Sequence, residues 1–312
     1  MKTKFLKAFL FLAIAVGLMM ALSPLFRPKQ AEELVELEGL GQVDYLVMGD
    51  SEGWASLQPM EVWQDYGFTG YNLSRAGQRL QDFYLQLKDT LKTQHPQVLL
   101  LETDILYKSI GMIGESEGYL TTVLSQAIPF LRYHDRWEDF LPDVQSEQGG
   151  AADRNIYRGA YYNTTVKPYT GGDYTQPTDQ VRHLPLSQRF FADKIVELCQ
   201  QNDIQLILYS SPSPLCWSYD MHNGIVAYAQ EKGLEFLDFN LMQQELGLDW
   251  NVDTLDLGDH INFSGAQKLT DYMGRYLSEN TNLQDHRGQQ GFENWDIDLE
   301  SYLTATGQTT KE

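Results

Sequence analysis

A short apolar stretch that ends in Gly-Asp-Ser constrains the fold of this chain more than any other feature. Residues 43–48 are mostly apolar, and the run stops abruptly at Gly49, Asp50 and Ser51. This pattern predicts a buried strand that enters a tight turn and leaves a serine at its carboxyl end. Open α/β sheets bind ligands at this edge, because loops and helix N-termini converge there. Ser51 is therefore a candidate nucleophile, although Gly-Asp-Ser alone also fits an ordinary turn.

Further apolar runs alternate with helical patterns along the chain. Short strands are expected at 70–73, 98–101, 204–209 and 234–238. Between and around them, apolar residues recur at helical spacing, which predicts helices at 59–67, 80–91, 186–199 and 224–232. Alternation of this kind is typical of right-handed βαβ units around a parallel sheet. The expected fold class is α/β with a central, mostly parallel sheet.

The first 29 residues do not belong to this pattern. Lys2, Lys4 and Lys7 precede an apolar run over residues 8–25, which is about long enough to cross a bilayer. A cleavable signal peptide is the alternative, but no convincing small-x-small site follows the run. We favour an uncleaved transmembrane signal anchor over residues 1–29. The lysines favour a cytoplasmic N-terminus, and either interpretation places the bulk of the protein outside the cytoplasm.

Composition limits the possible partners. The 312 residues are 42% hydrophobic and can bury the core of one large domain. The formal net charge of −20 argues against binding nucleic acid, whose phosphates need a basic surface. Cys199 and Cys216 could pair outside the cytoplasm, but the helical pattern around Cys199 favours two separate thiols. No group of His, Cys and carboxylate residues has metal-ligand spacing, so the sequence predicts no metal and no cofactor.

Three segments lie outside the alternating pattern. Residues 30–42 are rich in glutamate and are expected to form an acidic stalk. Residues 108–185 are interpreted as a long insertion, which either forms a substrate-binding lobe or is a solvated excursion. Residues 281–312 are polar and acidic, and we expect a tail or a peripheral helix there. Before them, Ser264 and Gln267 form a predicted capping box for a C-terminal helix.

An activated serine needs a base, and the base needs a group that orients it. His260 is the strongest of the six histidines, because it lies in a loop just before the C-terminal helix. The last loop of an α/β sheet can reach the exit of the first strand. Asp256 and Asp259 flank His260 as possible orienting carboxylates. His95 and His286 are expected at the surface, whereas His134, in an aromatic and charged run, could line a pocket.

These residues resemble a known family. The Gly-Asp-Ser triplet after the first strand, and the Asp-to-His stretch followed by Asn262, Gly265 and Ala266, resemble the SGNH/GDSL hydrolases. Within them, the chain looks most like the membrane-anchored extracytoplasmic branch related to the teichoic-acid D-alanylation and alginate O-acetylation proteins. The stretches at 59–67 and 133–137 also fit that branch.

The resemblance implies a three-layer α/β/α sandwich, SGNH/flavodoxin-like, over residues 43–280. It assigns the nucleophile to Ser51 and the general base to His260. The oxyanion donors that it implies are the backbone N–H groups of Ser51 and Gly77. Asp50, within the nucleophile motif, is a further candidate at the binding site.

The sequence departs from the family pattern at two points. The third family motif, usually Gly-x-Asn-Asp, is replaced here by residues 101–104, which leaves Thr103 and Asp104 as candidates in place of the asparagine. The orienting aspartate of the family lies three residues before the histidine, where this chain has Leu257. Asp256 is therefore the first choice for the orienting group and Asp259 the second.

The predicted activity is a two-step acyl transfer through an acyl-serine. The leading hypothesis is an anchored esterase or acyltransferase that adds or removes O-acyl groups, of acetyl or D-alanyl type. Its substrate would be a cell-envelope polysaccharide or a teichoic-acid-like polymer, with a membrane-bound O-acyltransferase as a possible partner. The alternatives are a catalytically degraded accessory protein that binds the polymer or the partner, and a lipase- or phospholipase-like esterase.

Overall fold

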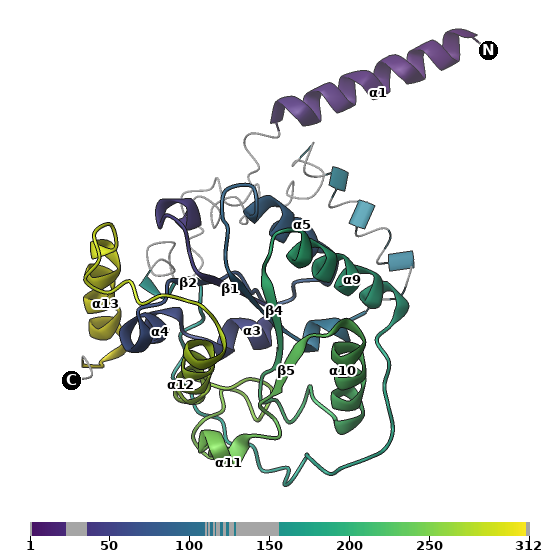
Figure 1. Ribbon diagram of the computed structural model, residues 1–312. Coiled ribbons are helices and arrows are strands. Elements are labelled where there is room, and N and C mark those ends of the chain that lie inside the picture. The colour runs from purple at the N-terminus through teal and green to yellow at the C-terminus, as the bar shows by residue number, and fades with distance from the viewer. Residues whose placement is uncertain are drawn as a thin grey trace.

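The computed structural model describes residues 2–22, 36–109 and 156–309, with a few further positions between 111 and 128 (Figure 1). The aromatic run at 133–137, residues 30–35 of the predicted stalk and much of the predicted insertion lie outside these residues. Within them, α1 (Lys2–Leu22) is the one helix that is long and apolar enough to cross a membrane.

Parallel strands form the centre of the described domain. One sheet has the order β2-β1-β3-β4-β5, and all of its neighbouring strands are parallel. The predicted apolar runs supply every strand, which confirms the α/β class with a parallel sheet. The strands are β1 (Tyr45–Met48), β2 (Gly70–Asn72), β3 (Val98–Glu102), β4 (Gln205–Ser210) and β5 (Glu235–Asp238).

Helices cover both faces of the sheet, because successive strand residues point to opposite sides. Leu46, Leu99 and Leu206 belong to a core shared with α5 (Leu80–Thr90), α9 (Leu186–Gln201) and α10 (Tyr219–Lys232). Val47, Leu100 and Ile207 belong to a second core, shared chiefly with α12 (Phe263–Asn280). The result is a three-layer α/β/α sandwich (Figure 1). The remaining elements are α3 (Ser51–Ser56), α4 (Pro59–Tyr66), the 3-10 turn η2 (Asp104–Leu106), α11 (Gln243–Leu246) and α13 (Glu293–Thr306).

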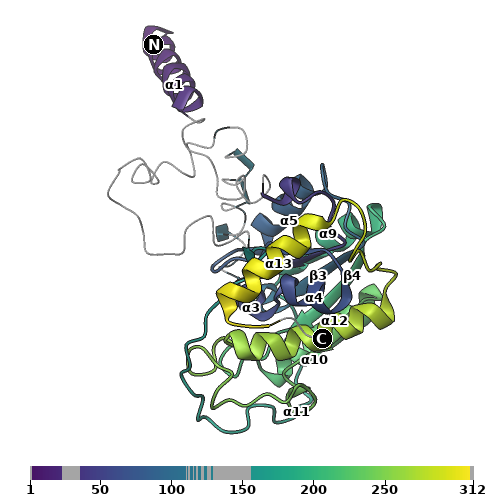
Figure 2. The same cartoon turned by 90° about the vertical axis from the view of Figure 1, so that its left-hand side faces the viewer.

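The residues after 280 end in a packed helix. α13 lies against α4 (Figure 2), and its Trp295 and Tyr302 are buried. Of the two structures expected for residues 281–312, a tail or a peripheral helix, the structure has the peripheral helix α13. His286, which was expected at the surface, is instead largely buried: its ring stacks on Phe292, and its Nε2 lies 3.1 Å from Asp44 Oδ1. The sequence could not show this, because Asp44 lies at the other end of the domain.

The predicted capping box is wrong. α12 begins at Phe263, and Asn262 caps it by accepting a hydrogen bond from the Gly265 N–H at 3.2 Å. Ser264 Oγ instead donates to Asp253 Oδ1 at 2.6 Å, and Gln267 contacts Glu61. Asparagine is among the best N-cap residues, so Asn262 begins the helix two residues before the predicted position.

Gly49 and Gly53, on either side of Ser51, let α3 pack tightly on the sheet. A Cβ on Gly49 would lie 2.6 Å from Glu102 Cβ and 2.9 Å from Gly53 Cα. A Cβ on Gly53 would lie 2.8 Å from Ser74 Oγ. All three separations are too short for non-bonded heavy atoms in contact. The glycines therefore permit the close approach of α3 to β3 that brings Ser51 to the sheet edge.

Gly49→Ala is expected to lower the free energy of unfolding by about 1–3 kcal/mol, because the added methyl group overpacks a closed contact. Urea denaturation of the purified protein measures this. Gly39→Ala is the matched control, since a Cβ at Gly39 has nothing within 4 Å. Equal urea midpoints for wild type and Gly49→Ala would show that the contact can relax freely.

Candidate functional site

The candidate site lies where the strand order reverses. The chain passes from β1 to β2 on one side of the sheet, whereas β3, β4 and β5 extend from the other side of β1. Ligands in such sheets bind outside the carboxyl ends of the strands at this switch point. Ser51 directly follows β1, and Thr103 and Asp104 directly follow β3. The fold thus places these predicted site residues at one edge of the sheet.

Ser51 is the first residue of α3, and Asp50 is the residue that caps this helix. Asp50 is fully buried. Its Oδ1 accepts a hydrogen bond from the Glu52 N–H at 3.2 Å, and its Oδ2 forms an ion pair with Lys108. The predicted binding candidate Asp50 therefore holds the helix start. Ser51 itself is half-buried, and its hydroxyl makes no hydrogen bond within the described part of the chain.

His260 and Asp256 form a close pair in the loop before α12. Asp256 Oδ2 lies 2.7 Å from His260 Nδ1, and Asp256 Oδ1 accepts the His260 backbone N–H at 2.7 Å. Leu257 takes a left-handed φ of +68°, which helps to turn the loop back so that the two side chains meet. Asp259 Oδ2 is 3.6 Å from the same Nδ1, beyond hydrogen-bond distance. The geometry thus favours Asp256 over Asp259 as the orienting carboxylate.

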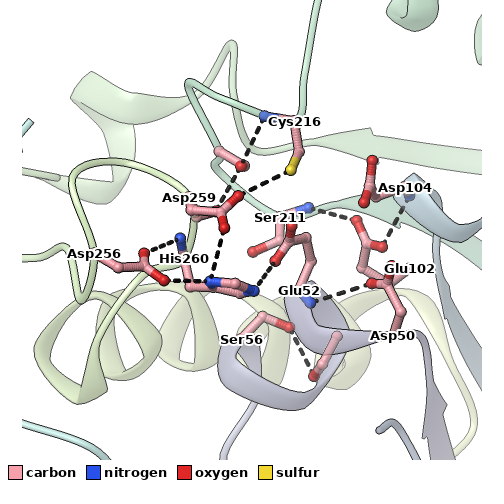
Figure 3. A network of polar contacts seen from close by, with 12 residues as sticks. Asp50, Glu52, Ser56, Glu102, Asp104, Ser211, Cys216, Asp256, Asp259 and His260 are labelled. Atoms are coloured by element: carbon pink, nitrogen blue, oxygen red, sulfur yellow. Dashed lines mark hydrogen bonds and ion pairs between the residues drawn. The ribbon is translucent and has the colours of Figure 1, made fainter. Parts of the chain in front are cut away.

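The other ring nitrogen of His260 faces Glu52, a residue that the sequence reasoning missed. His260 Nε2 lies 2.9 Å from Glu52 Oε2, and the Glu52 side chain is only 2% exposed (Figure 3). Burial alone would lower the pKa of His260, but the carboxylates of Glu52 and Asp256 outweigh this and raise it to about 9. The one sequence signal for Glu52 was its position as an ionisable residue directly after Ser51 and before Gly-Trp-Ala.

Further carboxylates gather beside Glu52. Glu102, the last residue of β3, accepts backbone N–H groups of Ser211 at 3.2 Å and Asp104 at 2.9 Å. Burial, with the nearby charge of Asp50, raises the pKa of Glu102 well above its ordinary value. The same two causes raise the pKa of Asp104 to about 7. Lys108 Nζ lies 2.5 Å from Asp104 Oδ2 and offsets part of this negative charge.

A small cavity opens between these carboxylates and the loop after β4. Its volume of about 20 Å³ is room for about one water molecule. Its polar lining includes Glu52, Glu102, Thr103, Asp104, Cys216 and His222. Thr103 Oγ1 is already paired with Ser210 Oγ at 2.5 Å. Ser51 is not among the lining residues.

Gly77, the candidate second oxyanion donor, lies in an exposed turn after β2. Its φ of +71° explains why glycine is found there. Within the described residues, no hydrogen bond joins Gly77 to Ser51. The structure therefore brings together the Asp256–His260 pair and places Ser51, Thr103 and Asp104 at one edge of the sheet.

Two groups of side chains have the donor atoms of a metal site. Ligand atoms of Glu52, Cys216 and Asp259 lie within 4.8 Å of one another, as do those of Asp256, Asp259 and His260. These residues come from loops far apart in sequence, so their spacing along the chain could not reveal the groups. Their atoms already have partners: Cys216 Sγ donates to Asp259 Oδ1 at 3.0 Å. Burial, together with Glu52, raises the pKa of the Cys216 thiol. Both cysteines are free thiols.

Comparisons with known proteins give only distant likenesses. No protein-family model matches the chain, and no curated protein matches it. The solved structures that are similar to it include a Bacteroides fragilis protein named as a putative acylhydrolase, with 13% identity, a TM-score of 0.41, and coverage of 80% of this chain and 95% of that one. A GDSL-like lipase from Bacteroides thetaiotaomicron has 14% identity, a TM-score of 0.39, and coverage of 80% and 96%. A gut microbial diltiazem-metabolizing enzyme has 14% identity and a TM-score of 0.29, with coverage of 77% of this chain and 47% of that one. At these scores, the fold assignment rests on the sheet and helices of the chain itself.

Proposed function

We propose that this chain is an ester-hydrolysing or acyl-transferring enzyme with Ser51 as its nucleophile and His260 as its general base. The observation that carries the proposal is the Asp256–His260 pair, formed at the switch point of the sheet where Ser51 leaves β1. A serine, a histidine and an orienting carboxylate at one sheet edge are the components of acyl-serine chemistry.

In the proposed reaction, neutral His260 accepts the Ser51 proton at Nε2 while Oγ attacks the ester carbonyl. Asp256 accepts a hydrogen bond from Nδ1–H, which fixes the tautomer and stabilises the imidazolium that forms. The developing oxyanion is stabilised by the Ser51 N–H, with Gly77 N–H as the second candidate donor. The imidazolium then protonates the leaving alcohol. Water or an acceptor hydroxyl, activated in turn by His260, releases the acyl group from Ser51.

The proposed substrate is an O-acylated polymer of the cell envelope, either a polysaccharide or a teichoic-acid-like chain. The apolar helix α1 supports a membrane anchor with the catalytic domain outside the cytoplasm. A membrane-bound O-acyltransferase is the proposed partner, since an anchored domain would lie beside it.

One observation favours a second candidate, an accessory protein without catalytic activity. His260 Nε2 contacts Glu52 rather than Ser51, so the nucleophile and the base are not hydrogen-bonded. In this alternative, the fold binds an envelope polymer or a membrane acyltransferase and performs no acyl transfer.

Covalent labelling separates the two candidates. Incubation of the full-length protein in detergent with a fluorophosphonate is expected to modify Ser51, and peptide mass spectrometry identifies the labelled residue. Ser56, in the same helix, is the internal control, because it is buried and bonded to Tyr209 OH at 3.0 Å. A folded protein that shows neither labelling nor hydrolysis of p-nitrophenyl acetate would favour the accessory candidate.

A further inference from the structure

Glu52 lies between the two basic side chains of the site. Its Oε2 is 2.9 Å from His260 Nε2, and its Oε1 is 4.0 Å from Lys108 Nζ. It occupies the first turn of α3, next to Ser51. Because its side chain is almost fully buried, little water screens the charge it presents to His260.

The position of Glu52 has a direct consequence for the base. Asp256 occupies Nδ1 of His260 and Glu52 occupies Nε2. An opposite charge close to an ionisable group favours its charged form, so two ionised carboxylates beside one imidazole favour the imidazolium, which carries a proton on both nitrogens. In that form the ring has no free lone pair, and it cannot take a proton from Ser51.

We propose that Glu52 is a positioning residue that holds His260 as an imidazolium and thereby confines the reaction to alkaline pH. This inference rests on the serine reaction proposed above. The base forms when the Nε2–H bond breaks and its electron pair stays on nitrogen, with the proton passing to solvent. Ser51 can then deliver its own proton to Nε2. Glu52 itself forms no bond to the substrate.

The groups that surround Glu52 and His260 support this assignment. Glu52 faces Asp50, Glu102 on β3, Asp104 on η2, Lys108 and the Cys216 thiol, besides His260. Burial raises the pKa of Glu52, and Asp50 raises it further, whereas His260 and Lys108 lower it. His260 in turn faces Asp256 and Asp259 from its own loop. Among these neighbours, Glu52 is the carboxylate on the nitrogen that the serine reaction needs.

Glu52→Gln tests the proposal, because the amide keeps the side-chain shape and removes the charge. The glutamate raises the pKa of His260, so its loss is expected to lower that pKa by one unit or more. NMR titration of ¹³C-labelled histidine, with His260→Gln to assign the signal, measures the shift. The acid limb of kcat/KM for p-nitrophenyl acetate is expected to move to lower pH by the same amount. At pH values below the lowered pKa of His260, a decrease of one pKa unit corresponds to about tenfold more neutral imidazole.

Glu197→Gln is the matched control, since Glu197 is exposed on α9 and pairs only with Lys194 in the described structure. It is expected to leave both the NMR titration and the pH profile unchanged. Glu52→Asp keeps the charge and is expected to keep the limb nearer its wild-type position. An unchanged His260 titration in folded Glu52→Gln would overturn the proposal. The NMR measurement needs no turnover, so it distinguishes failure of this inference from failure of the proposed activity.

Discussion

Replacement of Ser51 by alanine is expected to lower kcat/KM for p-nitrophenyl acetate on the order of 10⁴-fold or more. Ser51 would supply the oxygen that forms the acyl-enzyme, and nothing replaces that oxygen in the variant. Each tenfold loss corresponds to about 1.4 kcal/mol of transition-state stabilisation. The side chain is half-buried and makes no hydrogen bond in the described residues, so the variant is expected to fold normally. Circular dichroism and thermal unfolding verify this.

Ser56→Ala is the control for the loss of a hydroxyl from the same helix. Ser56 Oγ donates to Gly53 O at 3.1 Å and contacts Tyr209 OH at 3.0 Å. Its loss is expected to cost stability on the order of 1 kcal/mol and to change kcat/KM less than tenfold. A Ser51→Ala protein that keeps its activity would remove Ser51 as the nucleophile.

Asp256→Asn is the second change for which a large effect is expected. Asparagine retains an oxygen that can accept the His260 backbone N–H, but its amide can no longer hold the imidazolium by charge. The corresponding change in a Ser-His-Asp enzyme lowers kcat by about 10⁴-fold, because the histidine adopts the wrong tautomer. We expect a loss of roughly 10³–10⁴-fold here, measured as kcat at saturating ester.

Asp259→Asn is the comparison that decides between the two flanking aspartates. Asp259 Oδ2 lies too far from Nδ1 for a hydrogen bond, and its Oδ1 accepts the Cys216 thiol. Its replacement is expected to change kcat by less than tenfold. If the two variants lost activity equally, Asp256 would not be the unique orienting group.

The sheet could be predicted from the sequence because its strands are short runs of apolar residues. The β1 and β3 residues are buried throughout, and strands buried on both faces have near-continuous apolar sequences. The start of α12 was misplaced because Ser264, Gln267 and Asn262 all have capping propensity, and tertiary contacts decide among them. Ser264 bonds Asp253 instead of a backbone N–H of its own helix.

The site was predictable only where its parts are local in sequence. Asp256 and His260 lie four residues apart, so one turn brings them together. The contact of His260 with Glu52 joins opposite ends of the domain, and the pairing of Cys216 with Asp259 joins two separate loops. Such contacts depend on how the loops converge over the sheet edge. Charged residues directly after Ser51 and at the end of β3 were the only sequence signals for the carboxylate cluster.

The packing of α12 and α13 on α4 has a consequence for folding during synthesis. Trp63 of α4 packs against Trp295 in a tilted arrangement, with ring centroids 5.3 Å apart, and its Nε1 donates to Asp296 at 3.2 Å. α12 and α13, which close this side of the domain, are synthesised after the rest of the described domain. During synthesis, an N-terminal half that already holds Ser51 is therefore expected to have an exposed tryptophan surface and to lack His260, the proposed base. Contacts of such long sequence separation fold late, so this surface is expected to stay open, and prone to aggregation, until α12 and α13 pack on it.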